Sequence, residues 1–165
     1  MNAGRDGCVF CRREQTVYLE SPRWLLMRHA DPVPIAGWMM VAVRAHRAGL
    51  DELDATESRE LGQVLAAVAA AVRAETGCER TYGITFNEAV RHLHLHIVPR
   101  HASDAGTTSW ALADRYRLTA RGEASAAIPG DAERVARAIA GRCATALAAL
   151  DFVRPMAGPT GGCTA

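Results

Sequence analysis

The sequence predicts an α+β domain built around an antiparallel sheet. Short apolar runs of strand length are separated by turn residues, and one long Ala/Leu/Val segment has helical spacing. These elements follow one another as three strands, a helix and two strands, an order typical of this class. A length of 165 residues fits one domain that can bury its own core.

The first three strands are expected at three short apolar runs. Val17–Leu19 and Trp24–Met27 flank Glu20-Ser21-Pro22-Arg23, which is typical of a hairpin turn. Met39–Val43 is the third run, and Gly37 stands just before it. These runs predict the first half of the sheet.

The long helix follows the third strand. Asp54-Ala55-Thr56-Glu57 leads into it, and Gly77 is a plausible C-terminal stop. Its apolar stripe consists of Leu61, Val64, Leu65, Val68 and Val72. Two more strands are then expected at Tyr82–Phe86 and His92–Val98, joined by a short turn at Asn87-Glu88-Ala89.

After Arg100 the chain changes character, so we divide it into a core at residues 1–100 and a C-terminal extension at 101–150 that packs on the same domain. Trp110–Arg117 is expected to be a short helix or an ordered strap. Asp131–Leu150 is expected to be a helix with Asp131 as N-cap and an apolar face, which consists of Val135, Ala138, Ile139, Cys143 and Leu147. We expect a disordered tail at residues 151–165, which are rich in Gly, Pro and Thr from Pro155 onward.

Composition excludes some classes of partner. The net charge of +1 gives no general attraction to nucleic acid polymers or membranes. No apolar run approaches the roughly 20 residues that span a bilayer, and residues 1–7 lack the apolar core of a signal peptide. We therefore expect a cytoplasmic protein whose five cysteines are thiols or metal ligands. The chain contains no lysine, which removes lysine from any mechanism.

The segment His92–Val98, with the sequence HLHLHIV, is the most informative motif. On a strand, its three histidines project from one face while Leu93, Leu95 and Ile97 enter the core. Imidazole can act as a nucleophile, a proton carrier or a metal ligand. The alternative is a fortuitous His-rich strand or an isolated metal patch.

This pattern resembles the signature of the histidine triad superfamily, His-φ-His-φ-His-φ-φ, where φ is hydrophobic. The resemblance is strongest from Thr81 to Arg100. It implies a five-stranded antiparallel sheet with a long helix after the third strand, to which this chain adds a C-terminal helix, and commonly a homodimer with a continuous sheet. It also implies that His94 attacks the α-phosphate of a nucleotide conjugate, while His96 donates to a phosphate oxygen or to the departing group.

The resemblance also suggests residues that bind the substrate. The segment between Asn87 and His92 resembles a short-loop branch of the family, in which Asn87, Arg100 and Trp110 have counterparts. Asn87 and Arg100 are the nearest candidates for stabilising charge on the phosphate.

Three further residues have less settled roles. Asp31 lies where relatives bind the ribose hydroxyls, although Asp-Pro is also an ordinary turn. Trp38 stands where relatives usually have histidine, so it either lines the pocket or packs. Trp110 either closes over a planar ligand as part of a mobile strap or anchors that strap.

A second motif, Cys8-Val9-Phe10-Cys11, indicates a metal site or a redox pair. No βαβ pattern follows it, as a thioredoxin-like motif would require. The resemblance implies that His46 and His92 complete a structural zinc site, since four protein ligands leave no open position. His29 or His101 could also substitute in that site.

The leading functional hypothesis is a hydrolase or nucleotidyltransferase that acts on a small-molecule nucleotide conjugate through nucleotidyl-His94. One alternative is a catalytically silent nucleotide-binding module that retains the fold. Another is a pathway-specific enzyme that uses the scaffold for other chemistry, such as a lyase or a phosphorylase.

Overall fold

The computed structural model describes residues 7–155 and contains the predicted five-stranded antiparallel sheet. The strands lie in the order β1-β2-β3-β5-β4. Their bounds are Val17–Glu20 for β1, Trp24–Arg28 for β2, Met39–Val43 for β3, Arg80–Ile84 for β4 and His94–Arg100 for β5. The α+β class and the order of strands and helix along the chain are therefore confirmed.

Three longer helices accompany the sheet within residues 7–155. Helix α2 (Ala55–Thr76) connects β3 to β4, whereas α3 (Ser109–Ala120) and α4 (Pro129–Ala146) follow β5. Three short 3-10 turns are η1 at Leu50–Glu52, η2 at Ala105–Thr107 and η3 at Ala148–Leu150. Among the described residues, no helix is both long enough and apolar enough to cross a membrane.

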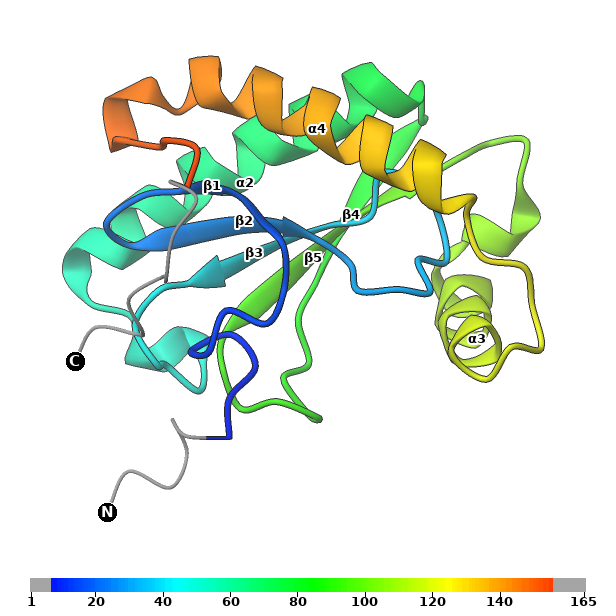
Figure 1. Cartoon of the computed structure of the whole chain (residues 1–165), viewed down its shortest axis with the longest axis horizontal. Coiled ribbons are helices and arrows are strands. Elements are labelled where there is room, and N and C mark those ends of the chain that lie inside the picture. Colours follow the sequence, from blue (N-terminus) through cyan, green and yellow to red (C-terminus); the bar gives the residue numbers. More distant parts are fainter. Residues whose placement is uncertain (1–6, 156–165) are drawn as a thin grey trace.

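Helices α2 and α4 lie together over one face of the sheet, and α3 stands apart at the end of the sheet (Figure 1). The covered face presents residues such as Leu26, Val41 and Leu95, which are paired across neighbouring strands. They share one core cluster with Val68 of α2 and Ile139 of α4. The added helix α4 is therefore part of the main core.

The ends of α2 are set by local signals that the sequence contained. The Asp54 carboxylate accepts hydrogen bonds from the backbone amides of Thr56 (2.7 Å) and Glu57 (2.8 Å). The Glu57 side chain in turn accepts from the Asp54 amide at 2.8 Å, which completes a capping box. Gly77 ends the helix in the left-handed region, with φ of 64°.

The opposite face of the sheet carries the candidate site. The segment of residues 8–14, here called the N-terminal arm, lies against it, and Phe10 packs in a second cluster with Leu25 and Met40. His94 pairs with Ala42 and His96 with Met40, so both imidazoles belong to this face because side chains alternate along a strand.

The prediction that strand β5 already includes His92 is wrong, although the rings of His92 and His94 both pack against Phe10 of the N-terminal arm. Strand β5 begins at His94, two residues later than expected, and β4 spans Arg80–Ile84 rather than Tyr82–Phe86. The amide of His92 donates to Val90 O at 2.8 Å, within a turn rather than in the sheet. The ring of His92 is fully buried, and Leu93, Leu95 and Ile97 enter the main core as expected.

The predicted N-cap of the last helix was also wrong. Helix α4 begins at Pro129 with Ile128 as N-cap, and Asp131 lies in the first turn. Proline suits that position because its missing N–H would be unpaired there in any case. The helix ends at Ala146 rather than Leu150, and η3 completes the segment.

The expected disordered tail is wrong for residues 151–155. Phe152 is buried in the main core cluster, and Val153 exchanges two backbone hydrogen bonds of 2.8 Å with Glu20. One aromatic side chain therefore holds this part against β1. Residues 156–165 lie outside the described residues.

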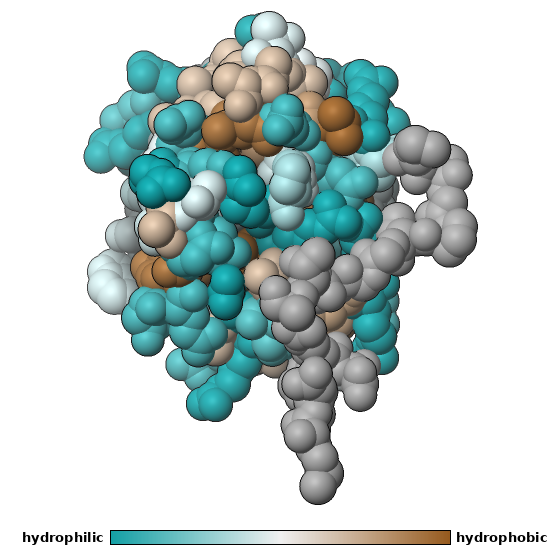
Figure 2. Space-filling model, turned by 90° about the vertical axis from the view of Figure 1, so that its left-hand side faces the viewer, coloured by the Kyte–Doolittle hydropathy of each residue, from teal (hydrophilic) through white to brown (hydrophobic). Residues whose placement is uncertain are grey.

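On the face shown in Figure 2, hydrophobic colour gathers mainly near the top, over the helical layer, and most of the remaining described surface is hydrophilic.

Candidate functional site

The ring of His94 is oriented by the backbone of His92, two residues earlier in the sequence. Its Nδ1 donates a hydrogen bond to the backbone carbonyl of His92 at 2.7 Å. A carbonyl can only accept, so the proton lies on Nδ1 and the lone pair on Nε2. Burial lowers the pKa of His94, which favours the neutral ring at neutral pH. The half-buried His94 therefore presents an oriented, unprotonated nitrogen.

The side-chain amide of Asn87 lies beside His94, at the start of β5. Its Oδ1 accepts from the backbone amide of His94 at 3.3 Å and from the hydroxyl of Thr85 at 3.2 Å. Its Nδ2 donates to Ala48 O at 3.3 Å. The structure thus brings Asn87 to the candidate nucleophile His94, where it fixes the turn before β5.

The ring of His92 faces the N-terminal arm. Its Nε2 donates to Val43 O at 2.7 Å, so Nδ1 carries the lone pair. That Nδ1 lies 3.3 Å from Cys8 Sγ and 3.6 Å from Cys11 Sγ. Burial lowers the pKa of His92 to about 4, which keeps the ring neutral and able to bind a metal.

These residues form a group with the composition of a metal site. The candidate ligand atoms of Cys8, Cys11, His46 and His92 all lie within 4.8 Å of one another. His46 Nδ1 is 3.2 Å from Cys11 Sγ. Tetrahedral zinc with bonds of about 2.0–2.3 Å separates its ligands by about 3.3–3.8 Å. The donor types fit such an ion, as do the separations of 3.2–3.6 Å between the thiols and the rings of His46 and His92. His29 and His101 do not belong to this group.

Phe10 joins the two parts of the site. It lies between the two cysteines in sequence, and its ring centroid is 5.1 Å from that of His92 and 4.6 Å from that of His94. The same turn that carries both thiols therefore also packs on the candidate nucleophile.

His96 belongs to an aromatic cluster with Trp38, His29 and Tyr116, on the other side of His94. The ring centroids of His96 and His94 are 5.0 Å apart. The Nδ1 of His96 lies 3.0 Å from the indole Nε1 of Trp38, which donates. Burial, reinforced by His94 and His29, lowers the pKa of His96 to about 3. Of the two expected roles of Trp38, lining the pocket or packing, its burial supports packing. Its indole also binds the motif histidine His96.

Two members of this cluster, His29 and Tyr116, had no predicted catalytic or substrate role. His29 Nδ1 donates to Ala30 O at 2.6 Å, and its ring centroid is 5.9 Å from that of His96. Tyr116 of α3 meets His29 edge-on at 5.5 Å and lies 5.8 Å from Trp38. The sequence offered only one signal for Tyr116, its place within Trp110–Arg117.

Three predicted substrate residues are not joined to His94 by any contact among the described residues. Arg100 lies six residues along β5, about 20 Å from His94, and donates to Glu79 at 2.8 Å. Asp31 is paired with Arg28 at 2.8 and 3.1 Å and lines a small hollow of about 160 Å³ beside His29. Trp110 is 85% exposed on the first turn of α3.

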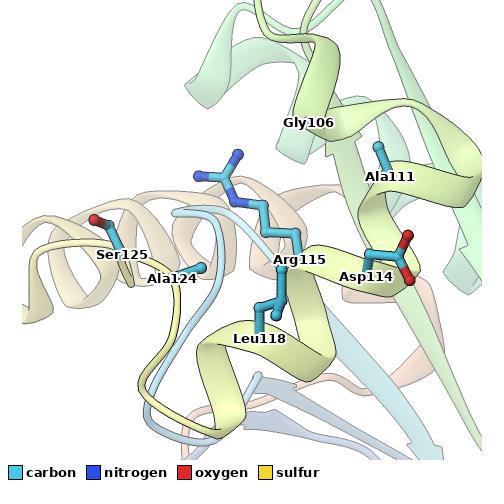
Figure 3. A pocket seen from close by; sticks show the side chains of 7 residues that line it. All are labelled: Gly106, Ala111, Asp114, Arg115, Leu118, Ala124 and Ser125. Carbon is cyan, nitrogen blue, oxygen red and sulfur yellow. The ribbon is translucent and has the colours of Figure 1, made fainter.

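A larger hollow of about 430 Å³ lies between α3 and the loop after it (Figure 3). Arg115 extends into it and is bound to Asp104 at 2.6 Å, whereas the side chain of Asp114 points away. None of its lining residues belongs to the aromatic cluster around His96.

Comparison with known proteins relates this geometry to one family. The sequence model of the HIT domain matches residues 12–103, more than half of the chain. No curated protein matches the chain in sequence with significance.

Solved structures share the fold at low sequence identity. A zinc-bound histidine triad family protein from Mycobacterium smegmatis is 20% identical, with a TM-score of 0.61 over 88% of this chain and 99% of that one. A hypothetical histidine triad nucleotide-binding protein from Sulfolobus tokodaii is 17% identical, with a TM-score of 0.61 over 85% and 94% of the two chains. A Hit-like protein involved in cell-cycle regulation from Bartonella henselae is 17% identical, with a TM-score of 0.60 over 86% and 98%.

Proposed function

This chain belongs to the histidine triad (HIT) family, and from that premise we propose that it hydrolyses or transfers nucleotidyl groups through a covalent nucleotidyl-His94 intermediate. The substrate is a small-molecule nucleotide conjugate attacked at its α-phosphate. A nucleotide-binding or hydrolase-type role follows from the family, and the covalent intermediate is our specific proposal.

The hydrogen bond from His94 Nδ1 to the carbonyl of His92 is the observation that carries the proposal. It fixes the ring so that the Nε2 lone pair can form a bond to phosphorus. The positive charge that develops on the ring is then stabilised through Nδ1–H, because this proton already points at a carbonyl oxygen. Water or another acceptor subsequently attacks phosphorus, and the electron pair of the N–P bond returns to Nε2.

Zinc is the metal we propose for Cys8, Cys11, His46 and His92. Two thiolates and two imidazoles form a closed set of four ligands, which suits a structural ion. When bound, the ion would hold the N-terminal arm against the segment before β5. A reducing, cytoplasmic setting is part of this proposal, since both thiols must stay unoxidised.

A homodimer formed through β4 is the assembly we propose. This strand lies at the edge of the sheet, and none of its residues is buried. An exposed edge offers unpaired backbone groups to a second strand. Pairing of two copies there would make the sheet continuous. The ligand partner we propose remains a small molecule, because the net charge of +1 gives no general attraction to nucleic acid polymers.

Single-turnover labelling tests the proposed intermediate. Protein in excess over a nucleotide conjugate should gain the mass of one nucleoside monophosphate on His94, observed by mass spectrometry without acid treatment. His94→Ala should gain none, whereas the matched control His101→Ala should label normally. Binding of a conjugate without labelling or turnover would instead favour the silent nucleotide-binding module.

A further inference from the structure

The indole of Trp38 fixes which nitrogen of His96 carries a proton. Indole N–H is a donor and never an acceptor, so the 3.0 Å bond requires an unprotonated Nδ1 on His96. The proton of the neutral ring must then lie on Nε2. Trp38 is only 5% exposed, and its backbone is held by bonds to Ile35 O (3.2 Å) and from the His29 amide (2.9 Å).

A ring held in this state can donate a hydrogen bond but cannot release its proton. Loss of the Nε2 proton would leave an imidazolate, an anion inside a half-buried cluster. A proton donor would have to be the imidazolium form, which has N–H groups on both nitrogens. Its Nδ1–H would then face the N–H of Trp38, and two donors cannot bond to each other.

The neighbours of His96 also disfavour the imidazolium form. The rings around it are those of His94, His29 and Trp38, none of which carries a negative charge. Among the described residues, no carboxylate has a hydrogen bond or an ion pair with His96. The geometry therefore leaves nothing that would stabilise a second proton on this ring.

From this arrangement we infer the substrate class of the proposed reaction, on which the inference rests. The site acts on nucleotide conjugates whose leaving group departs as a stable anion, such as a phosphate, a polyphosphate or a carboxylate. It discriminates against nucleoside phosphoramidates of alkylamines. Trp38 is the positioning residue that sets this preference through His96.

The lone pair of His94 Nε2 forms the N–P bond, the bond between phosphorus and the leaving oxygen breaks, and the electron pair departs with that oxygen. His96 Nε2–H donates a hydrogen bond and keeps its proton. An alkylamine would have to depart as a strongly basic amide ion unless its nitrogen is protonated first, and His96 supplies no proton for this.

The tautomer of His96 can be measured without any substrate. Two-bond ¹H–¹⁵N correlation spectra of the ¹⁵N-labelled protein should show an Nε2-protonated, neutral His96 with an unprotonated Nδ1 at pH 7. The assignment can be made by comparison with His96→Gln. An Nδ1-protonated or doubly protonated His96 in the unaltered protein would overturn the inference.

Paired substrates then test the preference. Diadenosine triphosphate and the adenosine phosphoramidate of a primary alkylamine, with the guanosine pair in parallel, share one nucleotide and differ in the leaving group. The ratio of kcat/KM should favour the anhydride by at least about 100-fold, the smallest factor typical of a positioned proton donor. A ratio below about tenfold would overturn the inference.

Two variants show whether Trp38 sets the ratio. Trp38→His introduces an imidazole that can accept as well as donate, so the ratio should narrow by about tenfold through faster phosphoramidate cleavage. Trp24→Phe is the matched control, because it removes another buried indole N–H, bound to Glu60 at 3.1 Å, away from the site. An unchanged ratio in Trp38→His would overturn the role of Trp38.

The two proposals fail in different ways. Absence of both turnover and His94 labelling with every conjugate would overturn the proposed function, and the substrate class with it. Normal labelling combined with equal use of both leaving groups would overturn the substrate class alone.

Discussion

The backbone carbonyl of His92 accepts the Nδ1–H of His94 at 2.7 Å, while the ring of His92 faces the thiols of Cys8 and Cys11. One residue therefore belongs to both the metal-type group and the support of the proposed nucleophile. The Phe10 ring adds a second contact between the two parts. Loss of the proposed zinc ion should accordingly affect His94 as well as overall stability.

The first prediction concerns metal content. Protein purified without added metal should contain about one equivalent of zinc by elemental analysis, and Cys8→Ser should lower both this content and the melting temperature. Cys78→Ala is the control, since it removes another buried thiol that lies outside the metal-type group and should leave the zinc content unchanged. Metal-free protein with unaltered melting would rule out a structural ion.

The second prediction concerns Asn87, which has a left-handed backbone with φ of 53°. Asn87→Ala should destabilise the protein by about 1–2 kcal/mol, because alanine tolerates this conformation less well. Asn87→Gly keeps the conformation and loses only the amide that holds the His94 N–H, so its stability should fall less. Chemical denaturation measures both.

Kinetics then separate the two roles of Asn87. If the amide positions the nucleophile, both variants should lose kcat to a similar degree, with smaller changes in KM. Activity retained in Asn87→Gly would show that only the backbone conformation matters.

Much of the fold could be predicted because its signals are local. The strand runs, the capping box of Asp54 with Glu57, and the stop at Gly77 each depend on residues a few positions apart. The departure of His92 from β5 could not be predicted in this way. It depends on hydrogen bonds with Val90 and Val43 and on the thiols of the N-terminal arm.

The same distinction between local signals and long-range contacts applies to the candidate site. The metal-type group followed from a family resemblance, and its four members do converge. The bond between Trp38 and His96 joins residues 58 positions apart, and Tyr116 reaches the cluster from a helix with a weakly apolar face. Neither contact leaves a pattern in the sequence. Arg100, expected near the phosphate, is instead bound to Glu79.

The third prediction uses the contact between α4 and β1. The Tyr18 hydroxyl donates to Glu133 at 2.5 Å, and burial together with this bond raises the pKa of Tyr18 from 10.0 to about 12. A raised pKa gives stability that is complete below pH 10 and is lost as the pH rises toward 12, because the unfolded state ionises first. The loss should be about 1 kcal/mol, because solvent screens part of the interaction at the hydroxyl.

Urea denaturation between pH 7 and pH 11.5 tests this prediction. Tyr18→Phe should be less stable than the unaltered protein at pH 7, and the difference should shrink above pH 10. Tyr82→Phe is the control, since Tyr82 is a half-buried tyrosine on the edge strand β4. A difference that stays constant to pH 11.5 would contradict the link between Tyr18 and Glu133.

The fourth prediction decides which aromatic residue of α3 serves the substrate. Trp110 was the candidate from the sequence, but it is 85% exposed, whereas Tyr116 contacts both His29 and Trp38 beside His96. Aromatic rings stack on planar groups, and Tyr116 is 42% exposed, which leaves part of its ring open to a ligand. We therefore expect Tyr116→Ala to raise KM about tenfold and Trp110→Ala to change it less than twofold, in line with the energies of aromatic pairs.

Both changes are at exposed or half-exposed positions, so each should shift the free energy of unfolding by less than about 1 kcal/mol. Tyr116→Phe separates ring stacking from the hydroxyl group and should keep KM near its original value. A further measurement uses fluorescence of a variant that retains Trp110 as its only tryptophan. Its emission should not change when a nucleoside monophosphate binds, because Trp110 has no contact with the cluster. A clear change, together with a raised KM in Trp110→Ala, would restore Trp110 as the residue that closes over the ligand.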